Sequence, residues 1–194
     1  MELVQLGNPI VKLKPMELND VEGILDVACF DEIWTHMSIT INNKQDALKY
    51  IENALNLRES GAEYPFVIID AKTNKIVGAT RLMDINKQHK RGEIGFTWLT
   101  PAYWKTAINT NCKYLLLEYC FEVLHWKRVQ IKTDHENIRS QRAIERIGAQ
   151  KEGILRNHMI RKDGTTRHTV MYSVTSEDWD HVKNHLINLL KKWQ

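Results

Sequence analysis

Residues able to do chemistry gather around two strand-like segments and the helix-like runs that follow them. Glu93 begins the stretch EIGFTWL, residues 104–109 (WKTAIN) precede an amphipathic run, and Asn137 and Ser140 open a second one. In a βαβ unit, ligands bind at the carboxyl edge of the strands, where a helix N-terminus presents unpaired N–H groups and a partial positive charge. These residues predict a site that combines a carboxylate, main-chain amides and polar side chains.

The carboxylate of Glu93 has two interpretations. Alternation along residues 93–99 places Glu93 and Gly95 on one strand face, and Ile94, Phe96 and Trp98 on the other. Because glycine has no side chain, the first face leaves room for a substrate beside the carboxylate. A glutamate at the start of a strand is, however, more often simply solvated.

Residues 104–109 contain no glycine, yet they can still bind phosphate, since main-chain N–H groups belong to every residue except proline. Ala107 has the smallest side chain after glycine, and Asn109 tolerates left-handed backbone geometry. Thr110 adds a hydroxyl in the first helical turn. The segment is either a modified phosphate loop or only a turn.

Asn137 and Ser140 stand three residues apart at the head of a helix-like run. Asn137 is a good N-cap, and Ser140 could bond back to the turn. The sequence agrees equally well with two interpretations. The two residues either form a capping pair, or their side chains face the gap between two parallel strands.

Hydrophobic periodicity predicts the elements that position these residues. Strands are expected at 10–17, 64–70, 75–85, 93–99 and 128–133, with two more around Asp163-Gly164. Helices are expected at 21–29, from 43 to 60, at 110–124, at 138–147 and after Ser176 as N-cap. The order 93–99, helix, 128–133 is a βαβ unit with parallel strands, whereas residues 64–99 form an antiparallel meander. The fold class is therefore α+β (α/β), with a mixed, mostly antiparallel sheet.

Length and composition indicate one globular domain, residues 1–194, with 43% hydrophobic and 26% charged residues. The net charge of +3 is spread along the chain, so nucleic acid is not indicated as a direct partner. No apolar stretch is long enough to cross a bilayer and no signal peptide is recognised, so we expect a cytoplasmic protein without a membrane partner. Cys29, Cys112 and Cys120 lack metal or redox spacing.

These segments, in this order, resemble the GNAT superfamily of N-acetyltransferases, and within it the group similar to the RimJ and RimL ribosomal-protein acetyltransferases. The likeness runs from Ile10 to Trp179. It rests on EIGFTWLTPAYW, WKTAIN, TNCKYLLLEYCFEVL, RVQIKTDHENIRSQRAIERIGA and the closing LRNHMIRKDG with TVMYSV and EDW. The resemblance implies a GNAT-type fold and acetyl-CoA (CoA) as co-substrate, without a metal.

The resemblance also implies where the cofactor lies, namely between the splayed strands 93–99 and 128–133. Main-chain groups near Trp98 and Leu99 would pair with the pantetheine and the thioester carbonyl. Asn137 matches an asparagine that contacts the pantetheine, and Ser140 falls where a hydroxyl approaches the sulfur. The pyrophosphate would rest on Trp104, Lys105, Thr106, Ala107, Ile108, Asn109 and Thr110.

The chain departs from the family pattern at two points. Where the family has Gln or Arg followed by two small residues, this sequence has Trp104, Ala107 and Asn109. The tyrosine that many members use as general acid aligns with Ile144. Ser140 is then the best remaining proton donor to the leaving thiolate.

The implied reaction is direct attack of an amine on acetyl-CoA in a ternary complex, because neither Cys112 nor Cys120 has an evident base partner. An amide near Leu99, or that of Thr100, could stabilise the oxyanion. An α-amine has a pKa of about 7.7 to 8.0 and a lysine about 10.4, so a water-mediated Glu93 suits the less basic amine. The runner-up function is a non-catalytic acyl-CoA sensor or scaffold.

By the same resemblance, acceptor specificity would lie in residues 30–41 and in the helix after them, with Trp34 and His158 as lining residues beside Glu93. The alternatives are a core role for Trp34 and a structural or solvent-facing role for His158. The acceptor is a ribosomal or other protein N-terminus, or a small-molecule amine, and a homodimer is left open. Four basic residues of the last hairpin either present a rim to an acidic acceptor or keep the hairpin soluble. They are Arg156, Arg161, Lys162 and Arg167.

Overall fold

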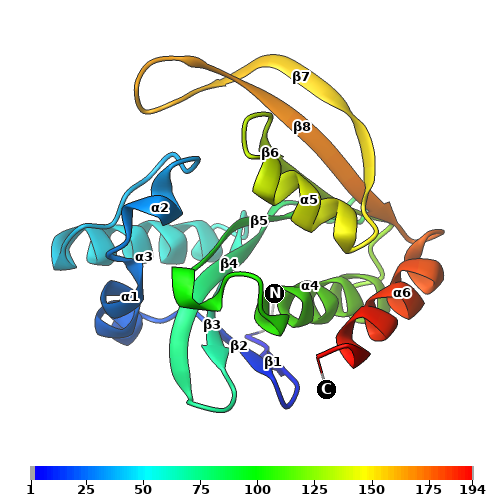
Figure 1. The fold of residues 1–194 in the computed structure, drawn as a ribbon, viewed down its shortest axis with the longest axis horizontal. Coiled ribbons are helices and arrows are strands. Elements are labelled where there is room, and N and C mark those ends of the chain that lie inside the picture. The colour runs from blue at the N-terminus through cyan, green and yellow to red at the C-terminus, as the bar shows by residue number, and fades with distance from the viewer. Residues whose placement is uncertain (1–2, 194) are drawn as a thin grey trace.

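Alternating apolar segments form one mixed sheet in the computed structural model, which describes residues 3–193 (Figure 1). Its order is β1-β2-β3-β4-β5-β6-β8-β7, with β5 and β6 parallel and all other neighbours antiparallel. The strands are β1 (Leu6–Gly7), β2 (Val11–Pro15), β3 (Tyr64–Asp70), β4 (Lys75–Asn86), β5 (Arg91–Leu99), β6 (Arg128–Asp134), β7 (Gln150–Ile160) and β8 (Thr166–Thr175). The predicted mixed, mostly antiparallel sheet is confirmed.

Helices cover both faces of the sheet. Figure 1 shows α1, α2 and α3 together on the left, α4 and α6 on the right, and α5 between the β6 label and α4. Their bounds are α1 (Val21–Ala28), α2 (Asp31–Trp34), α3 (Lys44–Glu59), α4 (Ala107–Glu118), α5 (Ile138–Arg146) and α6 (Trp179–Lys191), with short turns η1 (Leu18–Asp20), η2 (Pro101–Tyr103) and the π-type η3 (Tyr119–Val123). Within residues 3–193, none of these helices has the length and apolar character needed to cross a membrane.

Two helix boundaries differ from the sequence prediction. The helix expected at 110–124 begins earlier, at Ala107, because Thr106 caps it, and its last turn is the π-type η3. The final helix begins at Trp179 with Asp178 as N-cap, so the assignment of Ser176 as the cap was wrong. The Asp178 carboxylate instead accepts bonds from the amide and hydroxyl of Thr175, which tie the strand end to the helix start.

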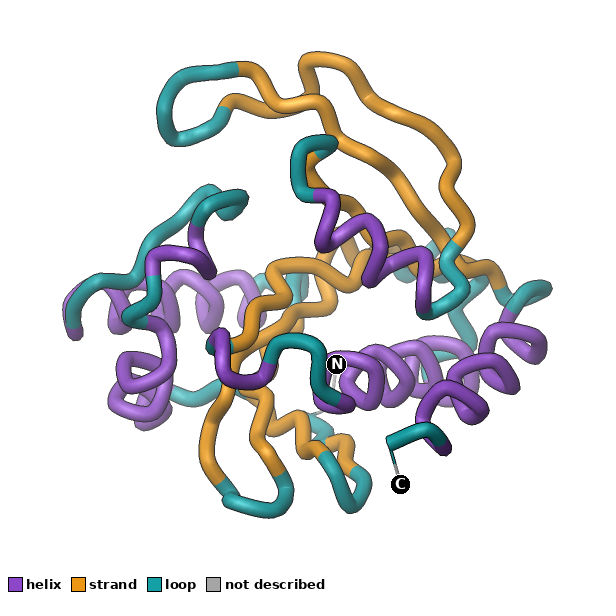
Figure 2. The backbone as a smooth tube through the Cα atoms, in the orientation of Figure 1, coloured by secondary structure: helices purple, strands orange, loops and turns teal. Residues whose placement is uncertain are grey.

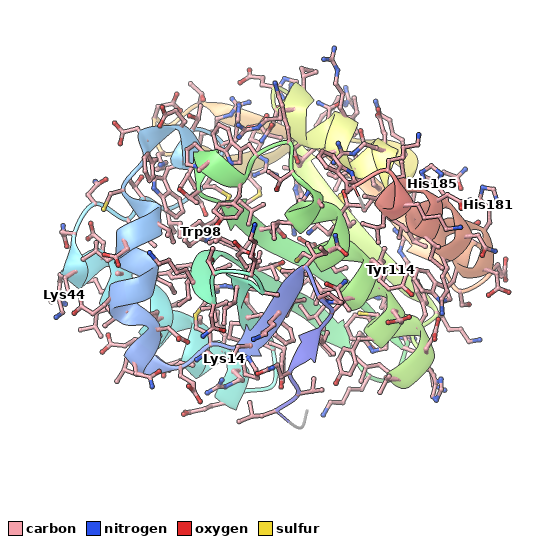
Figure 3. All side chains as sticks on the ribbon, turned by 60° about the horizontal axis from the view of Figure 1, so that its bottom comes forward. Lys14, Lys44, Trp98, Tyr114, His181 and His185 are labelled. Atoms are coloured by element: carbon pink, nitrogen blue, oxygen red, sulfur yellow. The ribbon has the colours of Figure 1, made fainter. Side chains whose placement is uncertain are left out.

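The sheet separates two hydrophobic cores. One lies under α4 and α6 and includes Ile94 and Leu99; the other lies under α1–α3 and includes Trp34 and Trp98. Figure 3 shows Trp98 in the interior of the molecule, whereas Lys44 and His181 project from its outer rim. Successive residues of β5 thus anchor both cores.

A β-bulge in β5 overturns the simple alternation expected for residues 93–99. Phe96 and Thr97 stand opposite the single β4 residue Thr80, and Phe96 has a positive φ of 47°. The extra residue shifts the side-chain pattern, so Ile94 and Trp98 point to opposite faces of the sheet. Period-two alternation cannot anticipate one inserted residue, and the prediction that Ile94, Phe96 and Trp98 share a face was wrong.

Candidate active site

β5 and β6 part soon after they pair. Their parallel ladder joins Arg91–Glu93 with Arg128–Gln130, and no further pair is formed along the described lengths of the two strands. Figure 2 shows the two strands together with the loop that leads from β5 into α4. Trp98 and Leu99 lie in the separated part of β5, where main-chain groups on that edge have no strand partner.

Glu93 lies at the point of separation and is not solvated, since only 1% of it is exposed. Its Oε2 atom is 2.9 Å from the Lys132 ammonium nitrogen and accepts a 2.9 Å bond from the Gln130 side chain. Both partners come from β6, one strand over. These two contacts hold the Glu93 carboxylate at the point where the strands separate.

The expected space beside Glu93 is already filled. A methyl group added at Gly95 would stand 2.5 Å from the Met83 sulfur and 2.9 Å from the Glu93 Oε1 atom. Gly95 is therefore needed so that these two side chains fit, and the prediction that it leaves room for a substrate was wrong.

The segment 104–109 turns into the first turn of α4. Thr106 is the N-cap: its hydroxyl donates to the Tyr103 carbonyl (2.8 Å) and accepts a long 3.4 Å bond from the Ile108 amide. Lys105, rather than Asn109, takes the left-handed conformation, with φ of 61°. Ala107 and Asn109 are first-turn residues, so their amides belong to the unpaired N-terminal set of the helix.

The side chains of this segment also pack structurally. Ile108 is 4% exposed and lies in the core, while the buried Thr110 hydroxyl is 3.5 Å from the Arg146 guanidinium of α5. Trp104 donates its indole N–H to the Leu99 carbonyl (2.8 Å), and the Arg139 guanidinium stacks 3.7 Å from its ring centre. Trp104 thus connects the end of β5 with α5.

The amide of Thr100 is already engaged, because it donates to the Val77 carbonyl at 2.9 Å. The suggestion that this N–H stabilises an oxyanion was therefore wrong. The Leu99 carbonyl, although bonded to Trp104, keeps a second lone pair.

Asn137 is the N-cap of α5, as the capping interpretation of the sequence predicted. Its Oδ1 atom accepts a 3.0 Å bond from the Ser140 amide. Ser140 is half-buried, and among residues 3–193 its hydroxyl makes no hydrogen bond. Ile144, at the position where a tyrosine acid was sought, is buried in the core.

A cavity of about 350 Å³ lies between residues 31–40 and the β7–β8 hairpin. Residues 31–40 form one wall, the end of β7 and the start of β8 form the other, and Asp134 of β6 contributes as well. Trp34 lines it and is also a core residue, with its ring centre 5.3 Å from that of Trp98. Its core role is confirmed, and its contact with an acceptor stays a prediction. Lys162 at the hairpin end bonds to the Ile39 carbonyl and the Thr40 hydroxyl (3.1 and 2.6 Å) across the cavity.

The structure separates His158 from this cavity. Its ring bonds to the Thr169 hydroxyl (3.1 Å) and lines a different, open hollow on the hairpin. Glu93 is also outside the cavity wall. Of the three residues expected to meet the acceptor, only Trp34 lines the cavity.

Asp134 is the buried acid of the cavity. Burial alone would raise its pKa, but hydrogen bonds from the Arg161 guanidinium and the Glu136 amide lower the pKa of Asp134 to about 2. It is therefore ionised and fully occupied by Arg161. Its position at the end of β6 anchors the hairpin that carries Arg161.

One ionisable residue beside the opening escaped sequence reasoning. Lys113 of α4 is buried, and its ammonium donates to the Thr97 hydroxyl at 2.6 Å, in the bulged part of β5. Burial lowers the pKa of Lys113 to about 8, while the charge of Glu93 raises it again in part. The sequence feature that could have indicated a buried charge is a single lysine within the apolar face of a helix. Such a lysine is ordinarily interpreted as solvent-exposed.

The comparisons with known proteins agree with this geometry. Residues 11–150 match the family model described as the acetyltransferase (GNAT) domain. "Uncharacterized N-acetyltransferase p20" of Bacillus licheniformis is 28% identical over 75% of this chain and 82% of its own length. "Putative ribosomal N-acetyltransferase YdaF" of Bacillus subtilis is 29% identical over 56% of this chain and 58% of its own length, which supports the RimJ/RimL-like group.

Solved structures show the same fold. A GCN5-related N-acetyltransferase from Brucella melitensis superposes with a TM-score of 0.91 at 26% identity, covering 98% of this chain and 86% of its own. The match extends over nearly the whole chain, so it includes the sheet and the helices that cover it. This chain belongs to the GNAT family of acetyltransferases, enzymes that use acetyl-CoA.

Proposed function

We propose that the chain transfers the acetyl group of acetyl-CoA to a primary amine, which attacks directly while both substrates are bound. The acceptor is a protein N-terminal α-amine or a small-molecule amine. The observation that carries this proposal is the separation of β5 from β6 beside the first turn of α4.

The residues around this opening fit acetyl-CoA. The edge of β5 near Trp98 and Leu99 offers main-chain groups to the amides of a pantetheine chain. The first turn of α4, from Ala107, offers unpaired N–H groups and the positive end of the helix dipole to a pyrophosphate. Arg139 and Arg146 of α5 add positive charge beside this turn, through their contacts with Trp104 and Thr110.

Bound acetyl-CoA supplies a thioester whose cleavage leaves a thiolate in need of a proton. Ser140 is the proposed donor, because its hydroxyl is unengaged within the described chain and its backbone is held by Asn137. Glu93 is proposed to take the proton of the amine through water, since its carboxylate is buried and held by Lys132 and Gln130.

The cysteines support direct attack over an acyl-enzyme. Burial raises the pKa of Cys112 to about 11 and raises the pKa of Cys120 well above its ordinary value. Both thiols stay protonated near neutral pH, and the thiolate is the nucleophilic form.

Release of free CoA in the presence of amines tests the proposal. We expect acceptor-dependent release in the wild type, and about a 100-fold lower rate in Glu93→Gln at a pH of about 6.5 with an α-amine acceptor. At a pH of about 8.5 the loss should be smaller, because most of the amine is then already neutral.

Glu52→Gln, at an exposed glutamate of α3, is the matched control and should behave as the wild type. A loss that does not change with pH would assign Glu93 to holding Lys132 rather than to proton transfer. Tight acetyl-CoA binding without CoA release for any amine would overturn the proposed function and leave the acyl-CoA sensor.

A further inference from the structure

The cavity of about 350 Å³ between residues 31–40 and the β7–β8 hairpin has a size suited to a small molecule. Figure 1 shows the hairpin extending over the molecule toward α2, and the Lys162 bonds to Ile39 and Thr40 hold its end there. The cavity lies beside the sheet centre, since Asp134 of β6 contributes to its wall.

Of the four basic residues expected to form a rim on the hairpin, Arg161 and Lys162 are committed to internal partners. Arg161 forms a two-pronged pair with Asp134 at 2.8 and 2.9 Å, and a further contact of 3.0 Å with Glu136. Lys162 is bonded to residues 39 and 40 across the cavity. Arg156 is exposed and lines the separate hollow beside His158. None of these three is available for a ligand in the cavity.

Arg167 is different, because it lines the cavity and its guanidinium is left unsatisfied. The unsatisfied atom is Nε, which is buried and makes no hydrogen bond, and no carboxylate within residues 3–193 forms an ion pair with the guanidinium. The charges of Asp134, Arg161 and Glu93 act on Arg167 without a hydrogen bond to it. Burial lowers the pKa of Arg167, yet a guanidinium remains charged at any ordinary pH. A buried, unsatisfied donor of this kind is costly to keep.

The acids of the cavity do not neutralise Arg167. Asp134 is occupied by Arg161, and Asp163 accepts bonds from the amide and hydroxyl of Thr165 (2.9 and 2.7 Å) in the hairpin turn. Asp31 stands on the opposite wall, on α2. Arg167 is thus a cation in a cavity whose described residues supply it with no bonded anion.

We propose that Arg167 binds a carboxylate of the acceptor, so that the substrates are small amines that also carry a carboxylate group. The planar fork of a guanidinium matches a carboxylate with two parallel hydrogen bonds. This inference rests on the proposed function, and it adds the chemical class of the acceptor and the residue that selects it.

Matched pairs of acceptors test the proposal. Glycine, β-alanine and alanine are each compared with their carboxamides, in which the carboxylate charge is removed and the amine is kept, and kcat/KM is calculated for the neutral amine of each acceptor. With CoA release as the readout, we expect the wild type to favour each acid by about 10- to 100-fold in kcat/KM, mostly through KM. In Arg167→Gln this ratio should fall to near one.

Two further variants and one further acceptor sharpen the test. Arg156→Gln, on the same hairpin but outside the cavity, should keep the wild-type ratio. Arg167→Lys keeps the charge without the fork and should keep part of the preference. If 2-aminoethylphosphonate is preferred to β-alanine, the site binds phosphate-like groups and the assignment of a carboxylate is overturned.

Three results would overturn the proposal itself. In the first, the wild type has the same kcat/KM for an acid and its carboxamide. In the second, Arg167→Gln still prefers the acid. In the third, Arg167→Gln loses activity equally on acids and carboxamides, which would assign Arg167 to offsetting the charge of Glu93. If no amine releases CoA, the proposed function fails, and Arg167 is then tested by melting temperature. The acids should raise the melting temperature of the wild type but not that of Arg167→Gln, and the carboxamides should raise neither. Equal shifts for acids and carboxamides, or for the two proteins, would overturn the proposal.

Discussion

At the scale of single residues, the site is built from charges that burial has set apart from water. Glu93 is held by Lys132, Asp134 is held by Arg161, and Lys113 has only the Thr97 hydroxyl as a hydrogen-bond partner in the described chain. A buried charge without a counterion lowers the free energy of unfolding. Lys113 has no bonded counterion among residues 3–193, so we expect a measurable loss of stability at this residue.

Lys113→Met should stabilise the protein. Burial lowers the pKa of Lys113 from 10.5 to about 8, so below pH 8 the folded state bears the cost of a buried ammonium, up to about 3 kcal/mol. Between pH 8 and 10.5 the unfolded chain binds more protons, the stability of the wild type rises with pH, and the advantage of the variant shrinks.

Urea unfolding at pH values of about 7 and about 10 measures this difference. Lys49→Met, at a lysine of α3 outside the core, should change stability little at either pH. A variant less stable than the wild type at neutral pH would mean that the Lys113–Thr97 bond outweighs the cost of burial; Thr97 keeps Thr80 as a partner in either case.

At the scale of elements, the start of α4 decides whether residues 104–109 bind phosphate. Because Thr106 is the N-cap, Ala107 occupies the first helical position and its side chain borders the unpaired amides. The left-handed turn is made by Lys105, one residue before the cap. The segment binds phosphate only if a ligand can approach those amides closely.

Substitution of Ala107 tests this approach. Ala107→Val should weaken acetyl-CoA binding by about tenfold, because a β-branched side chain crowds the amides, whereas Ala107→Gly should bind with similar affinity. Titration calorimetry gives the dissociation constants, and melting temperatures show whether α4 remains folded. Unchanged affinity in Ala107→Val would mean that the pyrophosphate binds elsewhere.

The bulge of β5 is the second decisive element. Around it, Ile94 and Leu99 lie in one core and Trp98 in the other, and it follows Glu93, the last β5 residue that pairs with β6. One inserted residue therefore connects β5 with both cores, next to the main-chain edge proposed for the cofactor.

At the scale of the whole molecule, the proposed function places the two substrates at different parts of the fold. The α4 turn and α5 border the opening proposed for acetyl-CoA, while residues 31–40 and the β7–β8 hairpin enclose the cavity proposed for the acceptor. The hairpin is otherwise exposed along much of β7, and Lys162 ties its end to residues 39 and 40.

Loss of this tie should affect one substrate only. Lys162→Ala should raise the KM of the acceptor several-fold, for acids and amides alike, and leave the KM of acetyl-CoA unchanged. Stability should change by less than about 0.5 kcal/mol, because the bonds are exposed. Lys151→Ala, at the exposed start of β7, is the control, and equal KM changes for both substrates would contradict the assignment.

Much of this architecture could be predicted from the sequence alone. Periodicity located the strands and main helices, Asn137 was recognisable as a cap, and the order and spacing of the motifs from Glu93 to Trp179 indicated the family. These features depend on neighbours within a few residues along the chain, where alternation, capping and turn chemistry act.

Only the tertiary structure decided which of the candidate side chains have partners. In the structure, Met83 fills the space at Gly95, and the Thr100 amide donates to the Val77 carbonyl. His158 lies outside the cavity, and Arg167 has no bonded counterion among the described residues. Each of these outcomes depends on contacts between segments distant in the sequence. The packing of those segments determines where a bulge, a buried charge or an unpaired donor occurs. The local sequence pattern therefore does not predict them.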